Sequence, residues 1–276
     1  MSAVVTPSRT RGWRTLALVF FAIFFLMPVY VLLVTAFKSP SEVDVVHMWS
    51  LPKSFSLDSF RAVWPKLTDG MVNSLMLAIP ASLISSIMGA ANGFVLSKWR
   101  FPGADVVFPL ILFGMFIPYQ AVIIPMFQTM IDLKLYGGLD GLILVHIIYG
   151  LPITTLIFRN FFIGVSDELI EAARVDGAGM LRTFAYIGLP LAVPAFAVSM
   201  IWQFTSAWND FLFGVVLTRQ EYNPVTVALN NIAGAQTVPF NEAMASAFLA
   251  SIPTLVVYLL LGRFFMRGLM AGALKG

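Results

Sequence analysis

The sequence contains no cysteine, only two histidines and few charged residues, and each shortage excludes a class of function. Without cysteine the chain has no disulfide framework, no thiolate nucleophile and no cysteine-ligated metal. His47 and His146 are far apart in sequence and belong to no metal-binding motif such as HExxH. Charged residues make up 11% of the chain, against about 25% in a soluble domain. We therefore expect no metal site and no catalytic residue, and the protein is not expected to be an enzyme.

Apolar residues are abundant instead: they make up 59% of the chain, and the mean hydropathy is +0.86. A membrane-spanning helix needs about 20 mostly apolar residues. Six stretches with few or no charges meet this requirement, at about 15–37, 71–97, 106–131, 141–160, 183–214 and 243–263. The sequence therefore predicts an all-α integral membrane protein with six transmembrane helices, organised as a single domain over residues 1–276.

The distribution of Lys and Arg predicts the orientation of these spans. The first apolar run is longer than the apolar core of about 7–15 residues in a signal peptide, so we expect it to be retained. With the N-terminus inside, eleven of the seventeen basic residues fall on the cytoplasmic side. Cytoplasmic segments next to membrane spans are normally the more basic ones. Both termini are therefore expected in the cytoplasm.

Polar residues inside the apolar frame mark a candidate path for a substrate. In the fifth span Ser199, Gln203, Ser206 and Asp210 are spaced 4, 3 and 4 apart, which places them on one face of a helix, with Asn209 beside them. A carboxylate near a membrane span normally faces a cavity or a partner. The alternative for Asp210 is an anchor at the outer membrane interface, together with the neighbouring Trp208.

Two other spans carry features that suggest packing or a cavity. The third span contains three prolines, and Gln120 follows the central one, so a kinked span is expected with Gln120 opposite the polar face of the fifth. In the second span Gly89 and Gly93 form a GxxxG pattern, which suits helix packing within the chain or a contact between subunits. His146 in the fourth span is interpreted as a packing residue, with a proton relay as the alternative.

The segment 166–184, between the fourth and fifth spans, is too polar for lipid and too regular for a bare linker. Ser166 is a good helix N-cap, and acidic residues follow it in the first turn. Gly177 allows the left-handed turn that ends a helix. A second short helix is expected from about Met180. The segment is thus predicted to be a helix–turn–helix on the cytoplasmic surface.

The spacing in this segment resembles a known family motif. Glu171-Ala172-Ala173, three further residues, Gly177, nine further residues, Ile187 and then Leu189-Pro190 resemble the EAA loop of ABC-importer permeases. The resemblance implies the type I ABC importer permease fold, with a cytoplasmic EAA coupling helix that docks onto an ATP-binding subunit. Small residues would permit close approach, and acidic residues would supply polar contacts. The implied coupling residues are Glu171, Ala172, Ala173, Asp176, Gly177, Ile187 and Pro190.

The resemblance extends over nearly the whole chain and is closest to maltose-type carbohydrate permeases. It includes Asn73-Ser74, Gly141-Leu142, Arg159-Asn-Phe-Phe162 and Trp208-Asn209, while Gln203-Phe-Thr205 looks like the glucose/mannose branch. This implies a subunit that moves a glucose/mannose-like sugar or a small oligosaccharide across the bacterial cytoplasmic (inner) membrane by alternating access. The substrate path would include Gln120, Gln203, Ser206, Asn209 and Asp210.

The same resemblance implies the partners. No Walker A sequence, GxxxxGK[ST], occurs in the chain, so ATP and Mg²⁺ are expected on two ATP-binding partner subunits and no cofactor on this chain. A second, different permease subunit, an extracytoplasmic sugar-binding protein and membrane lipid complete the expected partners, and no nucleic acid is expected. In the outer loop 218–242, Gly234, Ala235 and Gln236 are expected to contact the binding protein, unless the loop serves only as a connection.

An ion-coupled secondary transporter is the alternative function, and a non-transport membrane scaffold is a second one. Secondary transporters usually show repeated halves and discontinuous helices with ionisable coupling sites. The two halves of this chain show no repeat, and a scaffold would leave the EAA spacing unexplained. The sequence does not specify which sugar is carried, which proteins are the partners, or whether this subunit contributes directly to a sugar site in the membrane.

Overall fold

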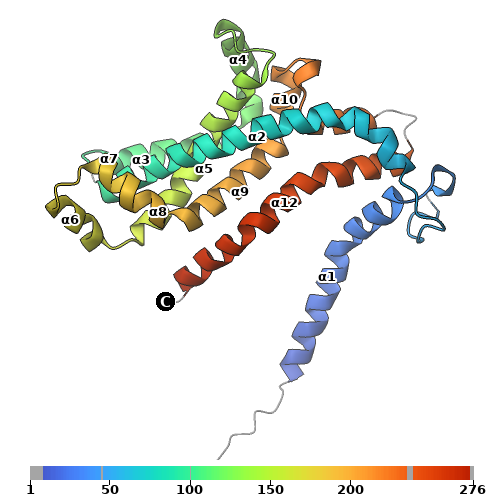
Figure 1. Ribbon diagram of the computed structural model, residues 1–276, viewed down its shortest axis with the longest axis horizontal. Coiled ribbons are helices and arrows are strands. Elements are labelled where there is room, and N and C mark those ends of the chain that lie inside the picture. The colour runs from blue at the N-terminus through green and yellow to red at the C-terminus, as the bar shows by residue number, and fades with distance from the viewer. Residues whose placement is uncertain (1–8, 45, 100, 235–238, 274–276) are drawn as a thin grey trace, which may run out of the picture. The chain divides into compact units, whose positions relative to one another are not determined.

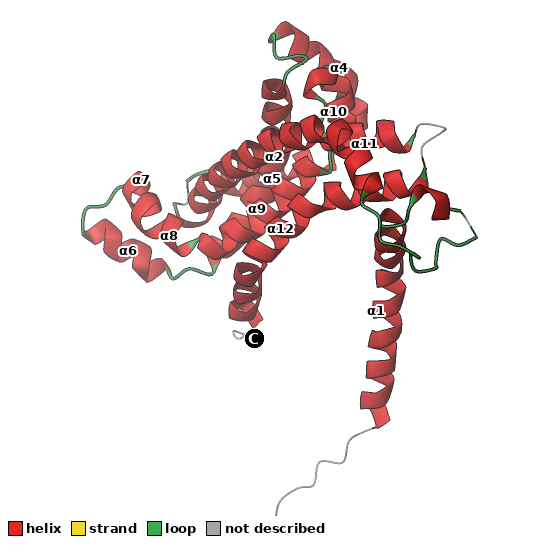
Figure 2. Ribbon diagram, turned by 45° about the vertical axis from the view of Figure 1, so that its right-hand side comes forward, coloured by secondary structure: helices red, strands yellow, loops and turns green. Residues whose placement is uncertain are grey.

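The computed structural model describes residues 9–44, 46–99, 101–234 and 239–273. Over these residues the backbone is helix and loop, with no β-strand and one isolated bridge between Gly137 and Thr218 (Figure 2). The helices shown in Figure 1 are α1 (Arg9–Ala36), α2 (Asp58–Lys98), α3 (Ala104–Phe113), α4 (Tyr119–Asp132), α5 (Leu139–Ile163), α6 (Asp167–Val175), α7 (Met180–Thr183), α8 (Leu189–Leu191), α9 (Val193–Trp208), α10 (Leu212–Leu217), α11 (Val225–Ala233) and α12 (Phe240–Ala273).

The chain folds into two compact units. One consists of Met1–Lys66 and Asn231–Leu249, and the other of Leu67–Asn230 and Ala250–Gly276. Three helices, α2, α11 and α12, contribute residues to both units. The candidate site residues that the structure describes fall in the larger unit, apart from Gly234.

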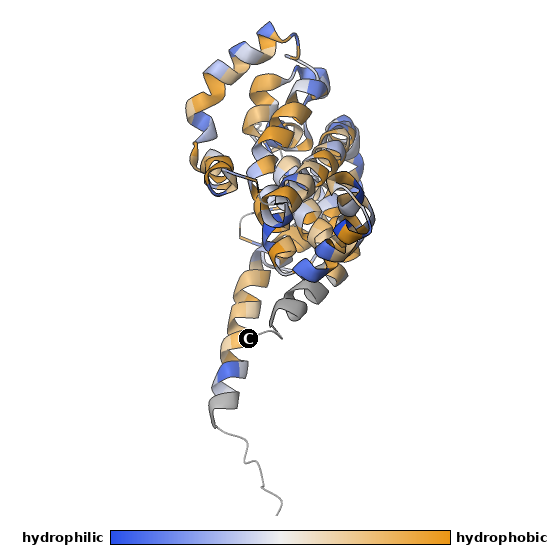
Figure 3. Ribbon diagram, turned by 90° about the vertical axis from the view of Figure 1, so that its left-hand side faces the viewer, coloured by the Kyte–Doolittle hydropathy of each residue, from blue (hydrophilic) through white to orange (hydrophobic). Residues whose placement is uncertain are grey.

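In the part of the chain that the structure describes, four continuous helices are long and apolar enough to cross a membrane: Gly12–Ala36, Asp58–Lys98, Leu139–Ile163 and Phe240–Gly262. They contain the first, second, fourth and sixth predicted spans. The second predicted span, 71–97, is only the apolar part of α2, which begins at Asp58. In α1 only 6% of the apolar window is buried, and the helix is coloured as apolar along most of its length in Figure 3. Such a helix suits lipid or a partner protein as its surroundings.

The third predicted span, 106–131, is broken near its central proline, as the prolines predict. It consists of two helical pieces, Ala104–Phe116 and Tyr119–Asp132, which are bent by 96° relative to each other. The break falls at Pro118, and Ile117 before it is extended (φ −77°, ψ 114°), the conformation that a following proline favours. The other two prolines, Pro109 and Pro125, lie inside α3 and α4.

The fifth predicted span, 183–214, is likewise not continuous. Met180–Leu191 and Val193–Trp208 are bent by 77° relative to each other around Ala192. Pro190 and Pro194 lie on the two sides of this bend, and neither can donate a backbone hydrogen bond to the preceding turn. At the other end α9 stops at Trp208, and α10 begins at Leu212. If each bent pair is one crossing, the described residues provide six crossings.

The larger unit is centred on α2, α5 and α9, which lie side by side in Figures 1 and 2. Small residues set the spacing of α2 and α5: a Cβ added to Gly89 would lie 2.5 Å from Thr154 Oγ1, and one added to Gly93 would lie 2.6 Å from the Arg159 nitrogen. Ser86 and Ser199 share a hydrogen bond of 2.8 Å between α2 and α9. The GxxxG pattern thus packs helices within this chain, which confirms the first of its two interpretations.

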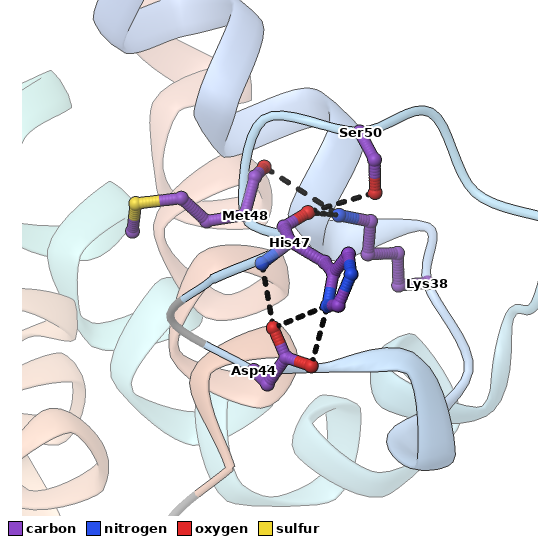
Figure 4. A network of polar contacts seen from close by, with 5 residues as sticks. All are labelled: Lys38, Asp44, His47, Met48 and Ser50. Carbon is purple, nitrogen blue, oxygen red and sulfur yellow. Dashed lines mark hydrogen bonds and ion pairs between the residues drawn. The ribbon is translucent and has the colours of Figure 1, made fainter.

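The smaller unit is held by buried polar groups. Asn241, which is fully buried, donates to Ser59 Oγ over 2.7 Å. The Lys38 ammonium is also buried and donates to the His47 carbonyl over 2.6 Å, which fixes the following loop (Figure 4). In the same loop the His47 ring, and then the His47 backbone N–H, hydrogen-bond the Asp44 carboxylate and hold the pKa of that carboxyl below its usual range. These hydrogen bonds stabilise the polar segment that connects α1 to α2.

The glycine contact between α2 and α5 gives a testable consequence. Gly93→Ala should lower the melting temperature of the purified protein by several degrees, because the new methyl group meets backbone atoms that side-chain motion cannot clear. Gly262→Ala is the matched control, since Gly262 is also helical but has nothing within 4 Å of an added Cβ. A Gly93→Ala protein as stable as the Gly262→Ala protein would contradict the described packing.

Candidate functional site

The segment after α5 folds as its sequence predicts. Ser166 is the N-cap of α6, and its hydroxyl accepts a hydrogen bond from the Glu168 N–H over 3.2 Å. Gly177 has φ +78°, the left-handed conformation expected for it. Two hydrogen bonds close the helix end, from Ala178 N–H to the Ala173 carbonyl and from Gly177 N–H to the Arg174 carbonyl. α7 then begins at Met180. The predicted helix–turn–helix is thereby confirmed.

This segment presents apolar side chains on its surface. Val175 is 88% exposed and Leu181 is 74% exposed, on either side of the turn at Gly177. Glu171, Ala172, Asp176 and Gly177 are exposed as well, so the turn carries both apolar and acidic groups. Exposed apolar side chains on a segment that is too polar for lipid are typical of a protein–protein contact. We call the exposed residues of 169–182 the docking surface.

Two of the predicted coupling residues point elsewhere. Ala173 is 7% exposed, because it lies on the inner face of α6 beside Ile170. Ile187 is half-buried against the chain's own core cluster, which includes Phe94 and Phe158. The Ala173 side chain is therefore covered by the chain itself, whereas the Ile187 side chain remains partly accessible. Gly177 meets nothing within 4 Å of an added Cβ, so within this chain its conformation, not its packing, requires glycine. Pro190 is exposed in α8 beside the bend at Ala192.

A buried lysine fixes the docking surface to the end of α2. The Lys98 ammonium donates to the Asp167 carboxylate over 2.5 Å and to the Val165 carbonyl over 2.6 Å. The side chain of Lys98 is only 4% exposed. Arg174 donates to the Lys98 carbonyl over 3.2 Å and stacks over the Trp99 ring at 4.3 Å. A cleft of about 210 Å³ lies between these groups, bordered by Glu171. Sequence patterns did not indicate this anchor, because its members come from distant parts of the chain.

A polar cavity of about 390 Å³ lies in the same unit, away from the docking surface. It is bordered by the start of α4, the middle of α5, the end of α9 and the start of α10. Its lining residues are Tyr119, His146, Tyr149, Gly150, Gln203, Ser206, Asn209, Asp210, Phe211, Leu212 and Phe213. Pockets for small ligands usually measure about 300–1,000 Å³. The cavity is therefore large enough for a small polar ligand.

The polar wall of the cavity is contributed by α9. The Gln203 amide donates to the His146 carbonyl over 2.8 Å, which joins α9 to α5 inside the protein. This contact requires Gly150, where an added Cβ would lie 2.5 Å from the Gln203 amide. Ser206 and Asn209 are exposed on the same wall. Four predicted path residues, Gln203, Ser206, Asn209 and Asp210, therefore line one cavity.

Asp210 is at the corner between α9 and α10. Its carboxylate accepts hydrogen bonds from Gly214 N–H over 2.9 Å and from Phe213 N–H over 3.2 Å, so it caps α10. The Thr226 hydroxyl donates to the Asp210 backbone carbonyl. His146 Nε2 lies 3.4 Å from Asp210 Oδ2, and both side chains are less than a tenth exposed. The neighbouring Trp208 is 2% exposed and donates to the Ala250 carbonyl, so it is a buried packing residue and not an interface anchor.

The expected position of Gln120 was wrong. Gln120 is exposed and does not line the cavity, whereas its neighbour Tyr119 does. The 96° bend at Pro118 sets which of the two residues faces inward, and the sequence alone does not give that rotation. Ser199, on the predicted polar face, is fully buried against Ser86 and lies outside the cavity lining.

Sequence reasoning also missed an aromatic cluster. The Phe213 ring lies 5.3 Å from Tyr119, 5.3 Å from Tyr149 and 5.8 Å from His146. These rings come from α4, α5 and α10, so no single-helix pattern joins them. Of the predicted binding-protein contact, Gly234 is exposed after α11. Ala235 and Gln236 lie outside the described residues.

The comparisons with known proteins agree with this geometry. Residues 81–270 match the model of the family described as binding-protein-dependent transport system inner membrane component. A probable ABC transporter permease protein of Pyrococcus horikoshii is 39% identical, with 98% of each chain covered. A glucose import system permease protein of Saccharolobus solfataricus is 33% identical, over 98% of this chain and 97% of the relative. The chain belongs to this family of ABC-importer permeases.

A solved structure shows that the fold is shared as well. In a bacterial ABC transporter involved in the import of the acidic polysaccharide alginate, one chain superimposes with a TM-score of 0.79 at 24% sequence identity. The match covers 96% of this chain and all of that one. The protein therefore has the type I ABC importer permease fold, and it is a membrane-spanning component of a transporter.

The lysine anchor can be tested without any transport assay. Lys98→Met should increase tryptic cleavage after Arg174 and Arg182 several-fold, because α6 loses its hydrogen bonds to the end of α2 and opens more often. Lys66→Met is the control, since Lys66 is 52% exposed and its ion pair with Glu242 contributes little. Equal cleavage rates in the two variants would show that Lys98 does not hold the docking surface.

Proposed function

We propose that this chain is a membrane-spanning subunit of an ABC importer that carries a sugar, and that ATP hydrolysis on partner subunits drives it. The observation that carries the proposal is the docking surface. In a member of this permease family, a capped and anchored helix–turn–helix exposes apolar and acidic side chains outside the spans. The chain has no Walker A sequence, so ATP and Mg²⁺ belong to two ATP-binding subunits that would receive this surface.

The remaining partners follow from the same proposal. The family description names a binding protein, which in this proposal is an extracytoplasmic sugar-binding protein. The exposed end of α11 at Gly234, with Ala235 and Gln236 after it, is the proposed contact for that protein. A second, different permease subunit completes the pathway. In this proposal the docking surface and both termini lie in the cytoplasm of a bacterial cell, which the distribution of the basic residues supports.

The cavity supports a sugar as the transported molecule. Sugars offer many hydroxyl groups that both donate and accept hydrogen bonds, and Gln203, Ser206 and Asn209 provide both kinds of partner. The aromatic rings of Tyr119, Tyr149 and Phe213 supply the apolar part of a pocket for a small molecule. The relative from Saccharolobus solfataricus is named as a glucose importer component, which makes a glucose- or mannose-like sugar the first candidate. We propose that this subunit takes part directly in the sugar path.

The experiment that tests this function is uptake by the complete transporter in proteoliposomes. Uptake of radiolabelled D-glucose, D-mannose or D-xylose should require internal ATP and the binding protein, and should persist when ionophores remove proton and sodium gradients. Uptake that continues without ATP and stops with the ionophores would favour the ion-coupled secondary transporter. Neither kind of uptake, with an assembled complex, would contradict a role in sugar import.

A pair of substitutions tests the docking surface. Gly177→Val should reduce binding-protein-stimulated ATPase activity and sugar uptake together, by about tenfold, because a β-branched residue is strained at φ +78°. Gly177→Asn should retain most activity, since Asn tolerates this conformation best among residues with a side chain. Both variants should insert into the membrane normally. If Gly177→Val couples as well as Gly177→Asn, the turn is not part of the ATPase contact.

A further inference from the structure

The polar cavity contains a buried nitrogen that has no hydrogen-bond partner among the described residues. His146 Nε2 is inaccessible to solvent and makes no hydrogen bond, although Asp210 Oδ2 lies 3.4 Å away. Leaving a buried polar group unpaired is unfavourable, because the group has given up its hydrogen bonds to water. The backbone carbonyl of His146 accepts a hydrogen bond from Gln203. The unsatisfied atom of this residue is therefore the ring nitrogen Nε2. A ligand that enters the cavity would gain by pairing with this nitrogen.

A sugar hydroxyl has the chemistry that this position lacks. A hydroxyl oxygen can pair with His146 and, through its hydrogen, donate to the Asp210 carboxylate at the same time. The two protein atoms are 3.4 Å apart, so one oxygen can lie at an ordinary hydrogen-bond distance of about 2.8 Å from both once the groups that cover His146 Nε2 move aside. The Asp210 carboxylate would keep its position while it accepts this hydrogen bond, because the N–H groups of Phe213 and Gly214 also donate to it.

The charge of the cavity restricts the ligand further. Among the described lining residues there is one carboxylate, Asp210, and neither Lys nor Arg. The other titratable side chains that face the pair are Tyr119 and Tyr149, neither of which is a cation. A second negative charge brought near a buried carboxylate is repelled more strongly than it would be in water. A sugar acid is therefore disfavoured at this position, and a neutral sugar is not.

We propose that His146 and Asp210 together form a selectivity pair, which binds one hydroxyl of an uncharged sugar unit and disfavours sugar acids. His146 thus has a role beyond the packing expected from the sequence. This inference rests on the proposed function, since it names the class of sugar that the importer carries. The cavity volume of about 390 Å³, near the lower end of ligand pockets, suits one sugar unit at a time.

The test measures binding to the permease without the binding protein. The chain has no cysteine, so Phe211→Cys places a single thiol in this chain at the cavity wall, at an exposed residue to which no sugar contact is assigned, and gel electrophoresis separates this chain from its partners. The assembled transporter in detergent is labelled with a water-soluble thiol reagent. Saturating D-glucose, D-mannose or D-xylose should slow labelling several-fold, and D-glucuronate at the same concentration should not.

The decisive variant is His146→Phe on the Phe211→Cys background. Phe keeps an aromatic ring against Phe213 and removes both ring nitrogens. Protection by the neutral sugars should fall about tenfold in apparent affinity, while labelling without sugar stays unchanged. His47→Phe, at the only other histidine, should leave protection intact. An altered labelling rate without sugar in His146→Phe would indicate a structural role and overturn the proposal.

Three further results would overturn the selectivity pair: protection by none of the neutral sugars, equal protection by D-glucuronate, or full protection in His146→Phe. The uptake measurement in proteoliposomes is separate, because it reports ATP-driven transport in the unmodified protein. ATP-dependent sugar uptake without cavity protection would refute this inference and leave the proposed function standing. Protection of the cavity thiol by neutral sugars without ATP-dependent uptake would refute the proposed function and leave the hydroxyl-binding role of His146 and Asp210 standing.

Discussion

A helix in hydrocarbon has no water to satisfy its backbone, so any break in a membrane helix needs protein groups nearby. This constraint determines where the chain can be irregular. At the corner after α9 the N–H groups that begin α10 are bonded to the Asp210 carboxylate, and the Asp210 carbonyl accepts the Thr226 hydroxyl. The break at Pro118 brings Tyr119 to the same region. The polar cavity forms where these two breaks meet α5. Irregular backbone and a potential ligand site therefore share one location.

The tight approach of α2 and α5 makes this arrangement possible. Gly89 and Gly93 leave no room for a side chain, so the two helices form a close-packed pair on which α9 lies. Gly150 does the same between α5 and α9, at the height of the cavity. Because Gly150 carries no side chain, the polar Gln203 side chain can occupy the space beside it. A rigid helix pair and a polar inner wall are thus consequences of the same few small residues.

Features governed by a few adjacent residues could be predicted from the sequence. Ser166 and Gly177 specify the beginning and end of α6 through local hydrogen bonds and backbone conformation, so the helix–turn–helix required no tertiary information. The polar face of α9 was also predictable, because a helix repeats with a fixed period. Residue rotation beyond a break was not predictable: the bend at Pro118 turns Tyr119 inward and Gln120 outward. The sequence also did not predict which face of α6 packs against the rest of the chain. That face includes Ala173, which is therefore buried.

The length of α2 has a mechanical consequence. Its 41 residues extend about 60 Å, roughly twice the hydrocarbon thickness of a bilayer. Pro65 and Pro80 remove hydrogen bonds from the helix but do not end it. Lys98, at the cytoplasmic end in the proposed orientation, is fixed to α6. Within the larger unit α2 runs from Leu67 to Lys98, so a force on the docking surface acts directly on a helix that also packs against α5 and is hydrogen-bonded to α9.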